Sequence, residues 1–443
     1  MRAIRSTLAI LAVFTACIMS GAADARSLIR DAEIERTLKG MSAPIFQAAG
    51  LTPSTVDLYI INDRSLNAFV TGGRNIFLHT GLLMDLDTPE EVLGVIAHET
   101  GHISGGHEAR RAINFRNARG PALVGLLLGI AAGVAGGGDA GVALAAGSQG
   151  AIQRSLLKFN RAEEASADQA GISYLTRAGI DPIGLLRVIE RFRGQEVLSI
   201  GNLDPYVLTH PLGTERMSLL ERRVAERRDT TFPPNPDREY WFDRMQAKLK
   251  GFLRSPERVL ERLAELPDSE MVLYEKAIAL HRVPDPAGAV GTMDRLLALK
   301  PNDAFYIELK GQILLESGRA AQALPYYRRA VSLAPNEPLI KAGLGRNLLQ
   351  LRTPGTAAEA LDVLQDARSD DLADASVLRD LATAYERAGD TGMATLATAE
   401  RYALVGNVKN AVSLARRAAG ILPNGSPGWL RAQDILKLDT GKD

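Results

Sequence analysis

The chain has 443 residues, of which 46% are hydrophobic and 23% are charged, a balance typical of a folded globular protein. At about 150 residues per domain, this length predicts roughly three domains. Lysine plus arginine and aspartate plus glutamate both number 52, so the formal net charge is zero. Phosphate binding requires a basic excess, and we therefore expect no nucleic acid among the partners.

The first 25 residues have the parts of a secretory signal peptide. Two arginines precede the apolar run 8–19, and a small-residue cleavage site ends at Ala25. We expect export with cleavage after Ala25. The single cysteine, Cys17, lies in this segment, so the mature chain has no thiol for a disulfide or a nucleophile. Lipidation at Cys17 is an alternative that the sequence leaves open.

A short β-rich region comes next. Residues 56–61, 67–71 and 75–78 are rich in β-branched and aromatic residues and are separated by turn residues, including the pair Gly72-Gly73. They predict a small sheet in a chain that is otherwise mainly α-helical.

Three helices are signalled after the sheet. Thr88 suits an N-cap, Pro89 the first helical position and Glu91 a capping box, so one helix is expected from Pro89 to about position 105. A second covers about 153–178, and Asp181-Pro182 begins a third as cap and first residue.

The segment 120–150 is rich in glycine, alanine and leucine. Its first 19 residues carry no charge and nominally reach transmembrane length. Their glycine content argues against a spanning helix, and a buried helical hairpin or a mobile flap over the active site is favoured. Peripheral contact with a membrane is the alternative.

A proline-rich linker at 229–237 precedes a region with a repeat of 34 residues, seen when Pro301 is aligned with Pro335. Within 304–337, small and aromatic residues occupy the positions typical of a tetratricopeptide repeat: Gly311, Leu314, Gly318, Ala323, Tyr327, Ala330 and Pro335. The pattern predicts an α-solenoid whose concave groove binds protein segments.

The chemistry lies in the motif His98-Glu99-Thr100-Gly101-His102. On a helix, His98 and His102 share one face, and two imidazoles at this spacing can bind one zinc ion while leaving positions open for water and substrate. Glu99 lies beside the metal position, where a carboxylate can take a proton from water. The motif predicts a zinc-dependent hydrolase with one zinc ion per chain.

Three residues compete to be the third ligand. Glu108 has the position at which a metzincin carries its ligand, and His107, five residues after His102, faces another side of the helix. Glu164 is favoured because Asp168 follows it by one helical turn, so that one carboxylate can bind zinc while the other supports a ligand histidine. Such acidic pairs are often only a solvated helix face, but the alanines between these two favour close packing.

These motifs resemble the gluzincin peptidases that include the CAAX prenyl protease and HtpX. The resemblance includes Asn67-Ala68-Phe69 and Gly81-Leu82-Leu83 upstream of HExxH. Together with the expected signal peptide and the repeats, the motifs most resemble the branch of this peptidase family that works in the periplasm of Gram-negative bacteria and enhances β-barrel assembly. The resemblance implies zinc ligands His98, His102 and Glu164, catalytic Glu99 and supporting Asp168. It also implies work on outer-membrane proteins and their assembly machinery.

The family's Ser/Thr-His-Pro element falls on Thr209-His210-Pro211, which implies a place for His210 at the active site. As imidazolium, His210 would stabilise the oxyanion of the reaction. As neutral imidazole, it would act as a latch: it would occupy the open coordination position of the metal and keep the enzyme inactive until substrate displaces it. The latch is favoured, because a protease among folding clients gains from being closed without substrate.

The sequence therefore predicts a signal peptide (1–25), a helical zinc-metalloprotease domain with a small β-sheet (26–228), a linker with bridging helices (229–269) and a tetratricopeptide-repeat solenoid (270–437). We expect a periplasmic zinc endopeptidase that acts on misfolded or stalled outer-membrane proteins, with clients or assembly machinery docked on the repeats. A non-proteolytic chaperone or scaffold and a membrane-associated peptidase anchored by 120–150 are the alternatives.

Overall fold

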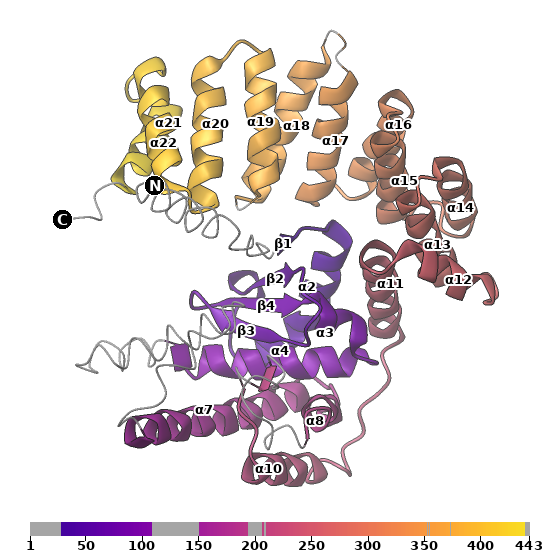
Figure 1. Ribbon diagram of the computed structural model, residues 1–443, viewed down its shortest axis with the longest axis vertical. Helices are drawn as coiled ribbons and strands as arrows, with labels where there is room; N and C mark the ends of the chain where they lie inside the picture. The colour runs from indigo at the N-terminus through magenta and orange to yellow at the C-terminus, as the bar shows by residue number, and fades with distance from the viewer. Residues whose placement is uncertain are drawn as a thin grey trace, which may run out of the picture. The chain divides into compact units, whose positions relative to one another are not determined.

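The computed structural model of the protein (Figure 1) describes residues 28–108, 150–193, 206–207, 210–351, 353, 355–372 and 374–438. The expected signal peptide, Cys17 and all but the last residue of the segment 120–150 lie outside the described residues. Within the described ranges, no helix combines the length and the apolarity needed to cross a membrane.

The chain divides into two compact units. Unit 1 contains Leu38–Phe242 and the strand β1 (Leu28–Ile29), whereas unit 2 contains Arg30–Thr37 and Asp243–Asp443. Two helices, α2 (Ala32–Ala48) and α11 (Pro236–Leu253), therefore supply residues to both units. The predicted domain boundaries at 228 and 270 remain predictions.

Unit 1 contains a four-stranded sheet in the order β1-β2-β4-β3. Strand β2 (Asp57–Ile61) pairs in parallel with β4 (Asn75–His79), which pairs antiparallel with β3 (Ala68–Thr71). The β3–β4 turn is made by Gly72 and Gly73, whose positive φ angles of 66° and 88° suit glycine. The predicted small sheet is thus present, and β3 forms one of its edges.

The other helices of unit 1 are α3 (Thr80–Asp85), α4 (Pro89–Ser104), α7 (Gly150–Arg177), α8 (Ile183–Glu190) and α10 (Thr214–Ala225), with a short 3₁₀ turn at Pro53–Thr55. Of these, α4 contacts the sheet, α7 and α8 pack on α4, and α10 packs on α7 and α8 (Figure 1). The three predicted helices correspond to α4, α7 and α8. The start of α8 differs by one residue: Pro182 is the N-cap, and Asp181 Oδ1 accepts a hydrogen bond from the N–H of Ile183.

Glycines let α4 and α7 approach each other closely. A Cβ atom at Gly101 would lie 2.7 Å from the carbonyl oxygen of Ala167, and one at Gly171 would lie 3.2 Å from the carbonyl carbon of Ala97. The two helices therefore meet backbone to backbone at these points. This contact brings the HExxH motif on α4 against the acidic pair on α7.

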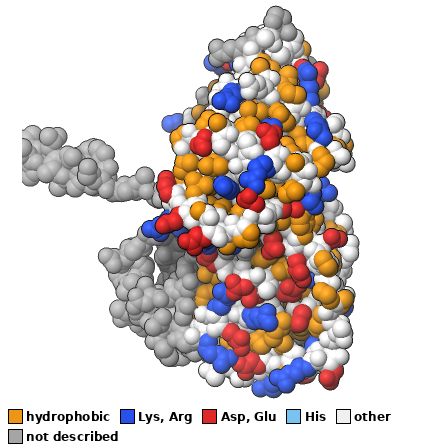
Figure 2. Space-filling model, turned by 90° about the vertical axis from the view of Figure 1, so that its right-hand side faces the viewer, with side chains coloured by type: hydrophobic (Ala, Val, Ile, Leu, Met, Phe, Trp, Pro, Cys, Tyr) orange, Lys and Arg blue, Asp and Glu red, His pale blue; other side chains and the backbone are white. Residues whose placement is uncertain are grey.

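Unit 2 is a succession of antiparallel helix pairs (Figure 1). Its helices are α12 (Pro256–Ala264), α13 (Glu270–Arg282), α14 (Pro286–Leu299), α15 (Ala304–Glu316), α16 (Ala320–Leu333), α17 (Pro338–Leu351), α18 (Thr356–Asp370), α19 (Ala375–Arg387), α20 (Thr391–Leu404), α21 (Val408–Ile421) and α22 (Pro427–Leu436). On the face drawn in Figure 2, charged side chains of both signs alternate with apolar ones, as the balanced composition leads one to expect.

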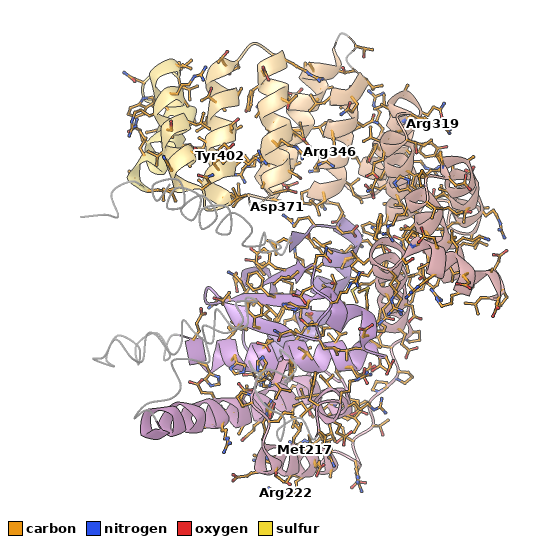
Figure 3. All side chains as sticks on the ribbon, viewed as in Figure 1. Met217, Arg222, Arg319, Arg346, Asp371 and Tyr402 are labelled. Carbon is orange, nitrogen blue, oxygen red and sulfur yellow. The ribbon has the colours of Figure 1, made fainter. Side chains whose placement is uncertain are left out.

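Most residues of the 34-residue pattern lie in the core of these helix pairs, whereas Gly318 and Pro335 are exposed in turns between helices. Tyr327 on α16 is buried, and a Cβ atom at Gly311 or Gly343 would lie 3.2 or 2.6 Å from its ring. A small residue on each neighbouring helix thus makes room for one large ring. Polar contacts also link successive repeats: Arg346 on α17 (labelled in Figure 3) pairs with Asp380 on α19 at 2.9 Å. The predicted mainly α fold with a repeat solenoid is confirmed.

Candidate metal centre and active site

The helix α4 begins and ends near the signals read from the sequence. Thr88 is its N-cap, and the Thr88 Oγ1 accepts a hydrogen bond from the N–H of Glu91 at 3.4 Å. The Glu91 carboxylate accepts from the N–H of Asp87, one residue before the position expected for a capping box. His98 and His102, one turn apart, are both buried, and their Nε2 atoms lie 3.1 Å from each other.

Glu164 on α7 closes the site from the opposite side. Its Oε2 lies 3.2 Å from Nε2 of His98, and its Oε1 lies 3.4 Å from Nε2 of His102. Its side chain is fully buried. The three residues named from the HExxH and Glu-x-x-x-Asp motifs therefore share one small volume.

His210 joins them as a fourth member. One ligand atom from each of His98, His102, Glu164 and His210 lies within 4.8 Å of the other three. His210 Nδ1 is 3.1 Å from both His98 Nε2 and Glu164 Oε2. His210 Nε2 is 3.2 Å from the carbonyl oxygen of Ala68 on β3. The His-Pro element thus points its ring into the cluster.

The donor set fits a zinc ion. Imidazole nitrogen and carboxylate oxygen are zinc ligands, and three protein ligands with an open position characterise catalytic zinc sites. Among the described side chains, Oε1 of Glu164 is a buried oxygen that forms no hydrogen bond, which is the state expected of a ligand atom. Glu99 is also buried, with its Oε1 3.2 Å from Nε2 of His210.

The charges of the cluster favour a bound cation. Burial opposes a charge on His98, yet hydrogen bonds with Asp168 and Glu164 raise its pKa to about 10. Burial would likewise raise the pKa of Glu164, but the charges of His210 and Arg216 hold it well below its usual value. The carboxylates of Glu164 and Asp168 therefore favour positive charge within the cluster.

Asp168, one turn after Glu164 on α7, contacts the outer ring nitrogen of His98. Its Oδ1 lies 2.8 Å from Nδ1 of His98. This contact leaves Nε2 of His98 directed into the cluster. Burial favours the neutral acid, but the Arg216 charge and the His98 hydrogen bond outweigh it and lower the pKa of Asp168 to about 2.

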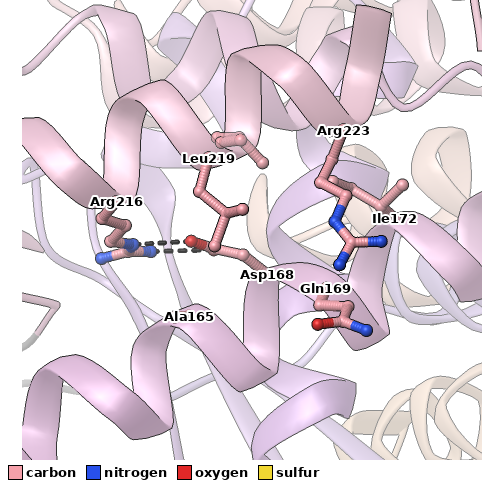
Figure 4. Close-up of a pocket in the computed structure, with 8 residues that line it drawn as sticks. Ala165, Asp168, Gln169, Ile172, Arg216, Leu219 and Arg223 are labelled. Atoms are coloured by element: carbon pink, nitrogen blue, oxygen red, sulfur yellow. Dashed lines mark hydrogen bonds and ion pairs between the residues drawn. The ribbon is translucent and has the colours of Figure 1, made fainter. Parts of the chain in front are cut away.

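Arg216 was not found by sequence reasoning. It is buried on α10 and donates to both oxygens of Asp168, through Nε at 2.6 Å and Nη2 at 2.9 Å (Figure 4). Its Nη1 lies 3.1 Å from Glu164 Oε2 and donates to the carbonyl oxygens of His210 and Pro211. One guanidinium thus links the acidic pair of α7 to the His210 segment. Nothing in the spacing of a single arginine signals these contacts.

The rear of the His210 ring is covered by Tyr206, whose ring centroid lies 4.7 Å away at an angle of 32°. Tyr206 in turn stacks on Phe192, with centroids 5.0 Å apart. These aromatic contacts and the Arg216 hydrogen bonds hold the imidazole against the cluster from two sides.

Comparison with known proteins gives some matches that span only part of the chain and others that span nearly all of it. The family model "Peptidase family M48" matches residues 28–224. The β-barrel assembly-enhancing protease of Yersinia pestis is 26% identical over 406 residues, 90% of this chain and 82% of that protein. The mitochondrial metalloendopeptidase OMA1 of Schizosaccharomyces pombe is 28% identical over 195 residues, 44% of this chain and 52% of that protein.

Among solved structures, MamA from Desulfovibrio magneticus RS-1 is 24% identical, covers 37% of this chain and 94% of its own, and gives a TM-score of 0.33. The match of residues 28–224 to the peptidase family M48 model agrees with the resemblance that the motifs predicted. The chain is a zinc metalloendopeptidase, as the sequence predicted.

Proposed function

We propose that this metalloendopeptidase works in the periplasm on outer-membrane β-barrel proteins that are misfolded or stalled, with the repeats docking clients or assembly machinery. The observation that carries the proposal is the extent of the match to the β-barrel assembly-enhancing protease. It covers 90% of the chain, so it includes repeats as well as peptidase. The residues 1–25, with their signal-peptide pattern, supply the route of export.

His98, His102 and Glu164 would hold the zinc ion, with Asp168 orienting His98 from behind. Zinc, when bound, polarises the scissile carbonyl and lowers the pKa of water. Glu99 would take the proton of the attacking water and pass it to the leaving amine. Its burial and its position next to the four-residue cluster support this role.

The edge strand β3 would bind the substrate backbone. It forms one side of the sheet, and its residue Ala68 lies against the His210 ring. An extended peptide added to this edge would run past the cluster and be recognised through main-chain hydrogen bonds, with little dependence on sequence.

His210 would act as a latch. Its contacts with His98, Glu164 and Glu99 support this role, because they fill the space in which water and substrate must meet the catalytic glutamate. Stabilisation of the oxyanion is the alternative role, for which the ring would have to move away from Glu99.

Trapping of clients with Glu99→Gln tests the whole proposal. The variant should retain zinc, accumulate uncleaved outer-membrane proteins and yield a mature chain that begins at residue 26. Capture of cytoplasmic proteins alone, or a mature chain that retains residues 1–25, would contradict it. If the protein is a non-proteolytic scaffold, Glu99→Gln should leave its function unchanged. If it is a peptidase anchored by residues 120–150, the protein should remain in the membrane fraction after salt extraction.

A further inference from the structure

The segment after α4 folds back onto the metal site. Gly105 ends the helix and Gly106 has a positive φ of 61°, so the chain reverses its direction and returns His107 toward α4. The His107 side chain is 2% exposed, and its Nδ1 lies 2.8 Å from Nδ1 of His102. The two rings meet edge-on, with an interplanar angle of 79°.

Both histidines of the HExxH motif therefore have the same arrangement. The Nδ1 of His98 contacts Asp168 and the Nδ1 of His102 contacts His107, each at 2.8 Å. The two Nε2 atoms point inward and lie 3.1 Å apart. In metal sites, a partner on the outer ring nitrogen fixes the tautomer and the orientation of the ligand.

We propose that His107 is a positioning residue of the metal centre, which holds His102 with its Nε2 lone pair directed into the ligand cluster. Two Nδ1 atoms in hydrogen-bond contact share a single proton. Only a proton on Nδ1 of His102 leaves Nε2 free to bind metal. The His102 Nδ1–H thus donates to His107, which accepts through Nδ1 and carries its own proton on Nε2.

The charge of the site explains why an imidazole suits this position. Glu99, Glu164 and Asp168 place three carboxylates around the cluster, and Arg216 is a guanidinium in contact with two of them. A carboxylate at position 107 would add another buried negative charge, which is costly without a partner. A neutral imidazole accepts the hydrogen bond without adding charge.

Gly105 provides a second, independent observation. A Cβ atom at this position would lie 2.5 Å from Nε2 and 2.9 Å from Cδ2 of His107, closer than side chains approach each other. Any other residue would force the ring to move. The absence of a side chain at 105 thus leaves the space that His107 occupies.

The test measures zinc affinity of the full chain by chelator competition, with the absorption spectrum of the Co²⁺ form as a readout of ligand geometry. Asn and Leu have the same branching, but only Asn offers an acceptor near the Nδ1 position. We expect His107→Leu to bind zinc about 10- to 100-fold more weakly with an altered Co²⁺ spectrum, and His107→Asn to stay within about threefold of wild type. Gly105→Ala should weaken binding as His107→Leu does. Ser104→Ala, on an exposed residue at the same helix end, should change nothing.

Wild-type affinity in His107→Leu or in Gly105→Ala would overturn the proposal, as would equal losses in His107→Leu and His107→Asn. If His107→Leu does not fold, Gly105→Ala decides, because it keeps the imidazole and moves it. The inference rests on the proposed ligand set, and His102→Ala tests that ligand set independently of His107. If His102→Ala retains zinc, His102 is not a ligand and the proposed ligand set is wrong, whatever the His107 variants show.

Discussion

Glu33 and Arg244 form an ion pair in which both side chains are fully buried, with Nε of Arg244 2.7 Å from Oε1 of Glu33 across 211 residues of sequence. Arg244 also pairs with Asp303 at 2.5 Å, and its guanidinium carbon lies 3.9 Å from the centroid of the Tyr306 ring. All these residues belong to unit 2, so the first turns of α2 complete the polar core at the start of the repeats.

Glu33→Ala should therefore destabilise unit 2 by about 3–5 kcal/mol, because it leaves Arg244 and Lys248 with fewer partners in a buried site. Urea unfolding of the full chain measures the loss. Glu359→Ala removes a partly exposed partner of the exposed Arg328 side chain and should cost about 0–1 kcal/mol. Equal losses in the two variants would show that the buried pair contributes no more than a surface pair.

Glu99→Gln should lower peptide hydrolysis by about 10²- to 10⁴-fold, because the amide cannot accept the proton of the attacking water. The zinc content should remain at one ion per chain, since Glu99 is outside the ligand set. Metal analysis and turnover of an unfolded protein substrate check the two parts together. Hydrolysis at the wild-type rate would exclude Glu99 as the base.

His210→Ala distinguishes the two roles of this histidine by the sign of its effect. If His210 is a latch, removal of its ring opens the space beside Glu99, and both self-cleavage and peptide turnover should rise. If it stabilises the oxyanion, turnover should instead fall by about 10- to 10³-fold with zinc retained. Gel analysis of self-cleavage together with peptide kinetics decides, and no change in either would remove His210 from the catalytic site.

The sequence predicted those parts of the site that follow a local rule. His98, Glu99 and His102 lie on one helix at a spacing set by the helical period, and Glu164 and Asp168 repeat that spacing on another. The repeats were visible for the same reason, because Gly311 and Tyr327 occupy fixed positions in a 34-residue period.

What the sequence could not predict depends on contacts between elements. Arg216 meets Asp168 only because α10 packs against α7, and 48 residues separate the two. His107 was set aside because a continued helix would turn it away from His102, whereas the helix ends at Gly105 and the chain folds back. Residues 30–37 similarly belong to the repeat unit through ion pairs that no periodicity signals.

Arg216→Lys should weaken zinc binding by about tenfold, because an ammonium cannot donate to both oxygens of Asp168 and still reach the carbonyl oxygens of His210 and Pro211. Chelator competition measures the affinity. Arg222→Lys, on an exposed residue of the same helix (labelled in Figure 3), is the matched control and should bind zinc as the wild type does. Unchanged affinity in Arg216→Lys would mean that the paired hydrogen bonds do not position the ligands.

The last prediction concerns the pH dependence of unit 2, in which Glu308 on α15 lies near Lys248, Asp31 and Glu33. Burial raises the pKa of Glu308 to about 7, with the charges of Asp31 and Glu33 adding to the effect and Lys248 opposing it. A carboxyl group whose pKa is higher in the folded state than in the unfolded state binds its proton more tightly when folded. Its contribution to the free energy of unfolding is therefore fully present below the unfolded pKa of 4.5. That contribution is lost as the pH rises through about 7.

Glu308→Gln should therefore raise the midpoint of thermal unfolding relative to wild type at pH 8, and the difference should shrink as the pH falls toward 5. Glu316→Gln, on the same helix, is a control of opposite sign. The hydrogen bond with His281 lowers the pKa of Glu316, so its ionised form stabilises the fold above its ordinary pKa, and the amide should lower the midpoint at pH 8. Calorimetry of both variants at the two pH values checks the signs, and a lower midpoint for Glu308→Gln at pH 8 would contradict the raised pKa.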